Sequence, residues 1–404
     1  MELQTQLQIR KQKGLEIAKT GKVKMQGDKW SVPSQSLNKH YDVILKLEKS
    51  ECNCPDHQER GIKCKHIFAV EITVSRSLNR DGSVTVTHTK RVTYSQNWPA
   101  YNASQIQEQD LFMKLMAELC QEVDEPMHTI GRPVMPLRDM VFASGLKVYS
   151  TFSLRRFMSD MRTARDRNYV SKVFSYSTVS NYMRKKELTP VLQMLITLSS
   201  LPLKTVETKF AIDSTGFRTT QFMEYCNEKH EVNRKHEWIK AHICCGVKTN
   251  IITAVNVGEG YSSDTLQFMP LSTQTMNNGF SIDEMSADKA YSSEDNLSHI
   301  ARHGGTAFIP FRSNTAVPNE KKTYVWHKMY NYFTYRREEF LAHYHLRSNV
   351  ESTVFMVKAK FTDLVRSKDE TAQINEVLLK VLCHNIVVLI QQMHEIGIKP
   401  EFLS

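Results

Sequence analysis

Three cysteines and one histidine lie close together in the chain, as Cys52-Asn-Cys54 followed by Cys64-Lys-His66. Thiolate sulfur and imidazole nitrogen bind Zn²⁺ at about 2.0–2.3 Å, and three Cys with one His complete its tetrahedral shell. No position would remain open for a substrate. We therefore predict one structural zinc ion held by Cys52, Cys54, Cys64 and His66, with His57 in the intervening loop as a competing ligand.

The other cysteines are scattered through apolar surroundings. Eight cysteines in 404 residues are too few for a disulfide scaffold. Buried cysteine behaves as a small hydrophobic residue. We therefore expect core positions for Cys120, Cys226, Cys244, Cys245 and Cys383.

Carboxylates follow two strand-like runs in the second half of the chain. Residues 208–213 end in Asp213-Ser-Thr-Gly, which we expect to terminate the strand, and residues 281–287 lead into Asp288. Loops after strands can present such groups to a shared site. Asp264 is a further carboxylate, either an accessory group or the N-cap of a helix.

Tyr344, Arg347, Glu351 and Lys358 are separated by three, four and seven residues. At about 100° per residue, this spacing places all four on one face of a helix. Taken alone, the pattern also fits a solvent-exposed face with an Arg347–Glu351 pair one turn apart. The two interpretations stay open at this level.

Together, Asp213-Ser-Thr-Gly, Ala287-Asp-Lys-Ala-Tyr291 and the Tyr-Arg-Glu-Lys pattern resemble the DDE transposases of bacterial and archaeal insertion sequences. The last motif resembles the signature of insertion-sequence family four and its relatives, and the resemblance covers about residues 205–395. It implies an RNase H-like catalytic domain in which three acids hold two Mg²⁺ or Mn²⁺ ions. These acids are Asp213, Asp288 and Glu351.

The same resemblance implies that Tyr344, Arg347 and Lys358 contact DNA beside the cleaved bond. The expected activity is cleavage of double-stranded DNA at element ends and transfer of the 3′-hydroxyl ends to target DNA, by a homodimer in the DNA complex. Only 62 residues lie between Asp288 and Glu351, which leaves little room for the large β insertion of some family members. We therefore do not expect the hairpin-forming route that depends on it.

Two other functions remain as alternatives. One is a domesticated transposase that binds DNA without cutting it, and the other is an RNase H-like nuclease or resolvase that cuts without joining. The intact acids disfavour the first and the Tyr-Arg-Glu-Lys pattern disfavours the second.

The zinc motif resembles the SWIM zinc finger over about residues 38–72, a module associated with DNA or protein binding. A strand at 41–47 and a helix at 64–72 would bring its ligands together. A hairpin is expected at 80–89 and a helix at 105–123. Gly131 to Pro136 breaks the pattern, and shorter helices follow at 137–146, 153–165 and 178–186, with Ser153 and Ser177 as possible N-caps.

Five strand-like runs in the second half alternate with helical segments and predict an α/β domain with a mixed sheet. They are residues 208–213, 238–247, 251–257, 281–287 and 306–311. No Gly or Pro occurs from 319 to 396, which favours long helices there.

The chain carries a net charge of +10, and its first 200 residues hold 30 basic and 20 acidic side chains against 23 of each in the remainder. Residues 155–186 contain nine basic side chains and only two acidic ones, Asp160 and Asp166. This density predicts a helix-turn-helix-like region that contacts DNA phosphates through Arg155, Arg156 and Arg162. A helical linker with solvated arginines is the alternative.

We therefore predict four regions: a zinc-finger domain of mixed α+β structure at 1–75, a hairpin and helical linker at 76–135, a helical DNA-binding region at 136–200 and the catalytic domain at 201–404. No apolar run reaches the roughly 20 residues of a membrane span, and the N-terminus does not resemble a secretory signal. The expected location is the cytoplasm of a prokaryote, in association with the nucleoid.

Overall fold

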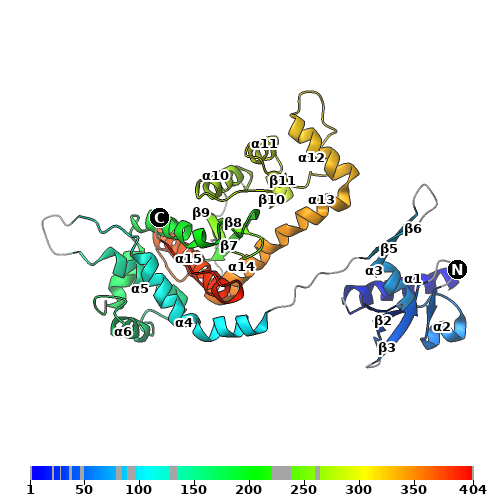
Figure 1. Cartoon of the computed structure of the whole chain (residues 1–404), viewed down its shortest axis with the longest axis horizontal. Coiled ribbons are helices and arrows are strands. Elements are labelled where there is room, and N and C mark those ends of the chain that lie inside the picture. Colours follow the sequence, from blue (N-terminus) through cyan, green and yellow to red (C-terminus); the bar gives the residue numbers. More distant parts are fainter. Residues whose placement is uncertain are drawn as a thin grey trace, which may run out of the picture. The chain divides into compact units, whose positions relative to one another are not determined.

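Four short antiparallel strands, in the order β1-β2-β3-β4, form the sheet of an N-terminal unit, Met1–Ser95. The strands are β1 (Lys24–Gln26), β2 (Lys29–Pro33), β3 (His40–Ile44) and β4 (Glu51–Cys52). The coordinates are those of a computed structural model, which describes residues 2–402 apart from 21, 28, 36–38, 46–49, 79–83, 89–96, 128–133, 221–237 and 260–263. Figure 1 shows both units, which we describe separately.

Helices α1 (Glu2–Lys19), α2 (Pro55–Arg60) and α3 (Lys65–Thr73) complete the sheet module. Helices α1 and α3 pack closely at Gly14, where an added Cβ would lie 2.6 Å from the Cβ of Phe68. Ile17, Trp30 and Ile67 are buried in the same small core as the three clustered cysteines. A separate pair, β5 (Val74–Leu78) and β6 (Val84–His88), forms the predicted hairpin, although its turn lies outside the described residues.

The second unit, Gln96–Ser404, contains a five-stranded mixed sheet in the order β11-β10-β7-β8-β9. Its strands are β7 (Lys209–Arg218), β8 (Trp238–Gly246), β9 (Ile252–Glu259), β10 (Glu284–Ala287) and β11 (Thr306–Phe308). The strands β7, β10 and β11 are parallel, whereas β8 and β9 continue the sheet in antiparallel pairing. The predicted mixed α/β class is therefore confirmed.

Alternate residues of β7 face two different cores, as expected for a strand with a period of two. Phe210 and Ile212 belong to the core covered by α10 (Asp264–Asn277), α11 (Glu294–Arg302), α12 (Tyr324–Tyr335) and α13 (Arg337–Tyr344). Ala211 and Phe217 face the opposite core, which includes residues of α14 (Ser348–Phe361) and α15 (Glu370–Glu395). Figure 1 shows α10 and α11 on one side of the sheet and α14 and α15 on the other.

The helices that precede the sheet share the α15 core. They are α4 (Trp98–Cys120), α5 (Leu137–Tyr149), α6 (Met158–Asp166), α7 (Tyr176–Met183) and α8 (Leu188–Ser200). Buried Asn385 accepts a hydrogen bond from the Ile252 amide of β9 at 3.0 Å and donates to the Ser199 hydroxyl of α8 at 3.1 Å. Asn375 likewise donates to the Met183 carbonyl at the end of α7. These amides attach the helical segment to the sheet.

Helix α15 is long and apolar enough to cross a membrane by length and composition, but 83% of its apolar window is buried in the protein. Such burial is typical of the central helix of a protein core. Cys383 on this helix is buried, as are Cys120, Cys244 and Cys245. Cys226 lies outside the described residues.

Several predicted boundaries were wrong. Ser214-Thr-Gly does not end β7, because pairing with β8 continues to Arg218 opposite Trp238. Helix α6 begins at Met158 rather than Ser153, and Ser175 rather than Ser177 caps α7, its side chain accepting from the Thr178 amide. The predicted domain boundaries at 75, 135 and 200 remain predictions.

Candidate functional site

Parallel pairing places Asp213 and Asp288 side by side. The register joins Ile212 of β7 to Ala287 of β10 as the last pair between these strands, so each aspartate is the next residue along its strand. Asp288 then begins a single 3-10 turn, where its side chain accepts a hydrogen bond from the Lys289 amide at 2.6 Å. Asp213 instead stays within β7, since its antiparallel partner Ile243 continues the ladder.

Arg347 connects the first aspartate to Glu351. Its Nη1 donates to Oδ2 of Asp213 at 2.6 Å, and its Nη2 donates to Oε1 of Glu351 one turn further along the chain. The arginine and aspartate side chains are only 20% and 23% exposed, whereas Glu351 is 57% exposed. One guanidinium group thus lies between two of the three predicted catalytic acids.

Burial raises the pKa of Asp213 above its ordinary value. The positive charge of Arg347 opposes this rise, and the negative charges of Asp288 and Glu351 increase it. The three carboxylates are therefore close enough to influence one another electrostatically. A cluster of this kind is stabilised by cations and fits a divalent metal ion with oxygen ligands.

The predicted helical face is divided among three segments. Tyr344 ends α13, Arg347 ends a 3-10 turn at His345–Arg347, and Glu351 and Lys358 belong to α14. Tyr344 lines a pocket of about 590 Å³ together with Asp288. Burial raises the pKa of Tyr344.

Lys358 lies farther from the acids. Its Nζ is 5.4 Å from the centre of the Phe217 ring on β7. Burial lowers the pKa of Lys358, and the charges of Asp363 and Arg218 also act on it. The structure thus brings Tyr344, Arg347 and Glu351 together at the acids and places Lys358 toward the end of β7.

Two further residues lie near the acids: Tyr291, to which the sequence assigned no role, and Asp264, which was expected to be either an accessory group or a helix N-cap. Tyr291 of the Asp288-Lys-Ala-Tyr motif is buried, which raises its pKa, and the charges of Asp264 and Asp213 add to the rise. Asp264 is the first residue of α10 and pairs with Lys240 at 2.7 Å. A tyrosine three residues after a candidate ligand was the available sequence signal for the first, whereas the Asp264–Lys240 pair required the fold.

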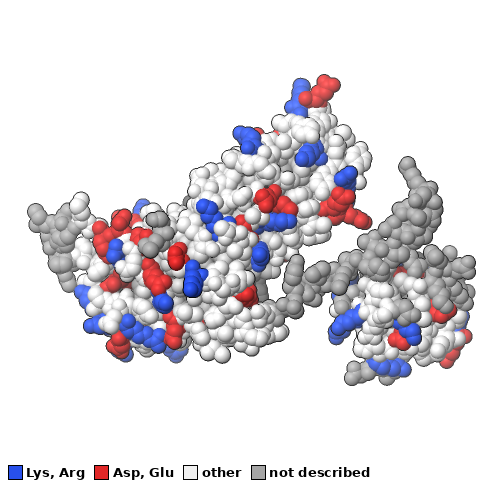
Figure 2. Space-filling model, in the orientation of Figure 1, with Lys and Arg blue, Asp and Glu red and all other residues white. Residues whose placement is uncertain are grey.

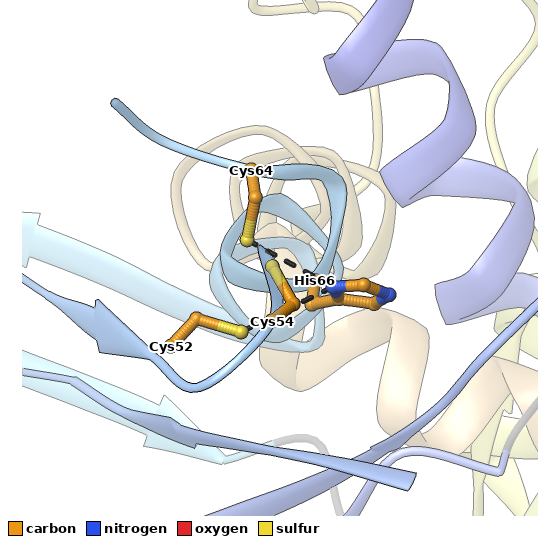
Figure 3. Close-up of side chains that lie close together, drawn as sticks. All are labelled: Cys52, Cys54, Cys64 and His66. Carbon is orange, nitrogen blue, oxygen red and sulfur yellow. Dashed lines mark hydrogen bonds between the residues drawn. The ribbon is translucent and has the colours of Figure 1, made fainter. Parts of the chain in front are cut away.

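The four predicted zinc ligands converge in the N-terminal unit. Sγ atoms of Cys52, Cys54 and Cys64 and a ring nitrogen of His66 all lie within 4.8 Å of one another, and all four residues are buried (Figure 3). The Nδ1 atom of His66 faces the sulfur atoms, 3.9 Å from Sγ of Cys64 and 4.0 Å from Sγ of Cys52. Hydrogen bonds from Cys52 and Cys64 lower the pKa of the Cys54 thiol.

This donor set fits zinc in number, type and spacing. The competing residue His57 is turned elsewhere, because its Nδ1 is 2.8 Å from the carbonyl oxygen of Ile62. Within the part of the chain that the structure describes, no second group of three or more such side chains has its ligand atoms equally close. The three predicted catalytic acids do not form one, and Arg347 bonds to both Asp213 and Glu351.

Two known family models match parts of the chain. The sequence model described as "Transposase DDE domain" matches residues 204–386. Residues 204–386 are therefore similar to transposase DDE domains. This DDE domain contains β7, β10 and α14, and with them Asp213, Asp288 and Glu351. The model described as "SWIM zinc finger" matches residues 41–75, which contain all four clustered ligands.

Among solved structures, the chain is similar to a piggyBac transposase in a synaptic complex with hairpin DNA. The identity is 12%, the match covers 72% of this chain and 74% of the other, and the TM-score is 0.35. The comparison with curated proteins gave no match.

Proposed function

We propose that the protein is a DNA transposase of the Tyr-Arg-Glu-Lys group, related to insertion-sequence family four. In this proposal it binds the ends of its element as a homodimer, cleaves phosphodiester bonds and joins the 3′-hydroxyl ends to target DNA. The observation that carries the proposal is the meeting of Asp213, Asp288 and Glu351 around Arg347 in a DDE domain. A transposase domain and a matched set of catalytic groups support the same activity.

The acids Asp213, Asp288 and Glu351 would hold two Mg²⁺ or Mn²⁺ ions. When bound, two such ions activate water and stabilise the charge on the attacking and leaving oxygens. Arg347 then has a second role. Once the acids hold cations, its guanidinium group is free to donate two parallel hydrogen bonds to a DNA phosphate, the geometry that arginine favours.

Tyr344 and Lys358 would contact the DNA on either side of the reacting bond. Tyr344 lines the pocket beside Asp288, which is large enough for a nucleotide displaced from the duplex. Lys358 lies toward the end of β7 and is suited to a phosphate farther along the strand. Arg155, Arg156 and Arg162 would contact phosphates from the helical region, where all three are exposed.

The test is cleavage of supercoiled or end-containing DNA in Mg²⁺ by Asp213→Asn, Asp288→Asn and Glu351→Gln. Each substitution removes one ligand charge and little volume, so cleavage should be lost while DNA binding stays near that of the wild type. Asp295→Asn, which changes an acid at the start of α11, is the matched control and should cleave normally. Cleavage at the wild-type rate by a variant would remove that acid from the site.

The reaction products distinguish a protein that cuts and joins DNA from one that only cuts it. Incubation of pre-cleaved ends with target plasmid should give joined molecules if the protein is a transposase. Cleavage without any joined product would assign it instead to the nucleases or resolvases.

A further inference from the structure

A second, larger cavity lies in the Gln96–Ser404 unit, away from the acids. Its volume is about 1040 Å³, and its walls come from the end of α5, the residues that lead into α6, α7, the end of β7 and the segment between α14 and α15. We call it the basic groove, because six cationic side chains line it against two acidic ones, Asp363 and Glu376. The cations are Lys147, Arg156, Arg184, Arg218, Arg366 and Lys368.

Both acids of the basic groove are already engaged by the protein. Asp363 accepts two hydrogen bonds from Arg218, at 2.7 and 2.8 Å. Glu376 accepts from the backbone amides of Arg366 and Ser367 at 2.9–3.1 Å. The acids therefore fix the groove wall and leave most of its positive charge uncompensated.

Three of the cations are exposed and uncommitted. Arg156, Arg184 and Lys368 form no ion pair or side-chain hydrogen bond with another residue that the structure describes. Lys147 is 9% exposed at the groove wall. Cations that converge on one cavity without carboxylate partners are suited to a polyanion.

The groove also contains backbone strain. Thr151 and Thr362 line it and have φ values of 55° and 64°, which β-branched residues rarely adopt. Two cations hold these turns in place. Arg366 donates to the Thr151 carbonyl at 2.6 Å, and buried Lys380 donates to the Thr362 carbonyl at 2.9 Å. Strain that the fold maintains in this way is typical of a binding site.

Strand β7 connects the basic groove to the acids. Arg218 lies five residues after Asp213 on that strand, a distance of roughly 17 Å at about 3.4 Å per residue. Lys358 lies near Phe217, the residue before Arg218, and within the electrostatic reach of Arg218 and Asp363. About 17 Å corresponds to roughly five base pairs at 3.4 Å per step along a DNA strand.

We propose that the basic groove binds the sugar-phosphate backbone of duplex DNA about five base pairs from the bond at the acids. This inference rests on the proposed function for its ligand, and it extends the phosphate contacts proposed for Arg156 to the cavity that Arg184 and Lys368 also line. Phosphate contacts of this kind fix the position of a duplex without reading its sequence. The groove would thus align the DNA along β7, with Lys358 contacting a phosphate beside the groove.

The experiment compares two triple variants with equal changes of charge. The groove variant is Arg156→Gln, Arg184→Gln and Lys368→Gln. The control variant is Lys114→Gln, Arg302→Gln and Lys321→Gln, which changes three exposed cations outside the groove. Binding of a labelled duplex of arbitrary sequence is measured by fluorescence anisotropy over a range of salt concentrations.

The groove variant should flatten the slope of log affinity against log salt by up to about 2.7, which is 0.9 for each of three phosphate contacts. The control variant should keep the wild-type slope. Equal slopes for the two variants, with circular dichroism showing both folded, would overturn the inference. Because Arg156, Arg184 and Lys368 bond no other described side chain, their loss is not expected to unfold the protein.

The cleavage assay separates this inference from the proposed function. If the groove variant weakens DNA binding but the wild-type protein never cleaves DNA, the groove inference stands and the transposase proposal is wrong. If the protein cleaves and joins DNA but the two triple variants bind DNA equally, the transposase proposal stands and the groove inference is wrong.

Discussion

Arg347 holds Asp213 and Glu351 on two different nitrogens of one guanidinium group. The two acids come from β7 and α14, and Arg347 lies 134 residues after Asp213 in the 3-10 turn before α14. An arginine in this position neutralises part of the acidic cluster before any cation binds. A divalent ion must therefore compete with Arg347 for the carboxylates of Asp213 and Glu351.

Replacing Arg347 with Ala should therefore have two opposite effects. Cleavage should fall by about 10²-fold, the usual effect of losing one donor to the charge of a transition state. The rise in melting temperature caused by Mg²⁺ should become larger, because the competing cation is gone. Differential scanning fluorimetry with and without Mg²⁺ measures the second effect. Arg336→Ala, an exposed arginine paired with Glu339, should change neither quantity, and a smaller Mg²⁺ shift in Arg347→Ala would contradict the competition.

Lys358→Met should lower cleavage and joining without lowering stability. Methionine keeps the apolar stem that packs near Phe217 and removes only the charge. Overall DNA affinity should change little, since one phosphate contact among many is lost. Single-turnover rates measure the cleavage activity, and urea unfolding curves measure the stability. Normal cleavage by the variant would leave Lys358 as a structural residue.

The SWIM zinc finger should contain one zinc ion per chain and should unfold when it is removed. In small domains of this type the metal-binding free energy is largely folding free energy. Cys54→Ser should abolish the bound zinc, whereas Cys120→Ala, a buried cysteine of the other unit, should retain it. Elemental analysis after purification under reducing conditions gives the zinc content. Full zinc in Cys54→Ser would show that the ligands are different.

His384 should make the second unit less stable in mild acid. Burial lowers the pKa of His384 to about 4, from 6.5, and one ring nitrogen lies 2.9 Å from the Asn250 carbonyl oxygen. Between pH 6.5 and 4 the unfolded chain binds a proton that the folded chain excludes, so stability falls as pH falls through this window. The full effect is roughly 3 kcal/mol.

His384→Gln tests whether His384 causes this pH dependence, because glutamine can donate to the Asn250 carbonyl and does not titrate. The difference in unfolding free energy between pH 7 and pH 5 should be smaller in the variant than in the wild type. Urea unfolding at the two pH values provides it. An identical pH dependence in both proteins would assign the acid sensitivity to other groups.

Local pattern was sufficient to predict the five strands and the order of the acids. Hydrophobic runs end where polar residues begin, and this rule placed Asp288 correctly after β10. It failed at Ser214-Thr-Gly, because pairing with β8 extends β7 through polar residues, and no local signal records a partner strand. The zinc ligands were predictable because four side chains within one short segment define the site.

Other features depended on contacts between distant segments. A spacing of three and four residues fits one continuous helix, but a 3-10 turn at His345–Arg347 interrupts it and directs Arg347 toward β7. The basic groove combines side chains from α5 to Lys368, which no periodicity connects. Figure 2 shows Lys and Arg side chains gathered around α6, as the charge count indicates, but composition could not show which of them share a cavity.

The buried amides Asn375 and Asn385 have a consequence for recombining this protein with its relatives. They bond α7, α8 and β9 from within α15, so the helices before residue 200 and the sheet after it share one interior. A chimera joined near residue 95 exchanges a unit that has a separate core. A chimera joined near residue 200 would set foreign helices against these amides and leave buried polar groups without partners. The helices before residue 200 and the sheet after it should therefore be inherited together, whereas the N-terminal unit can be exchanged separately.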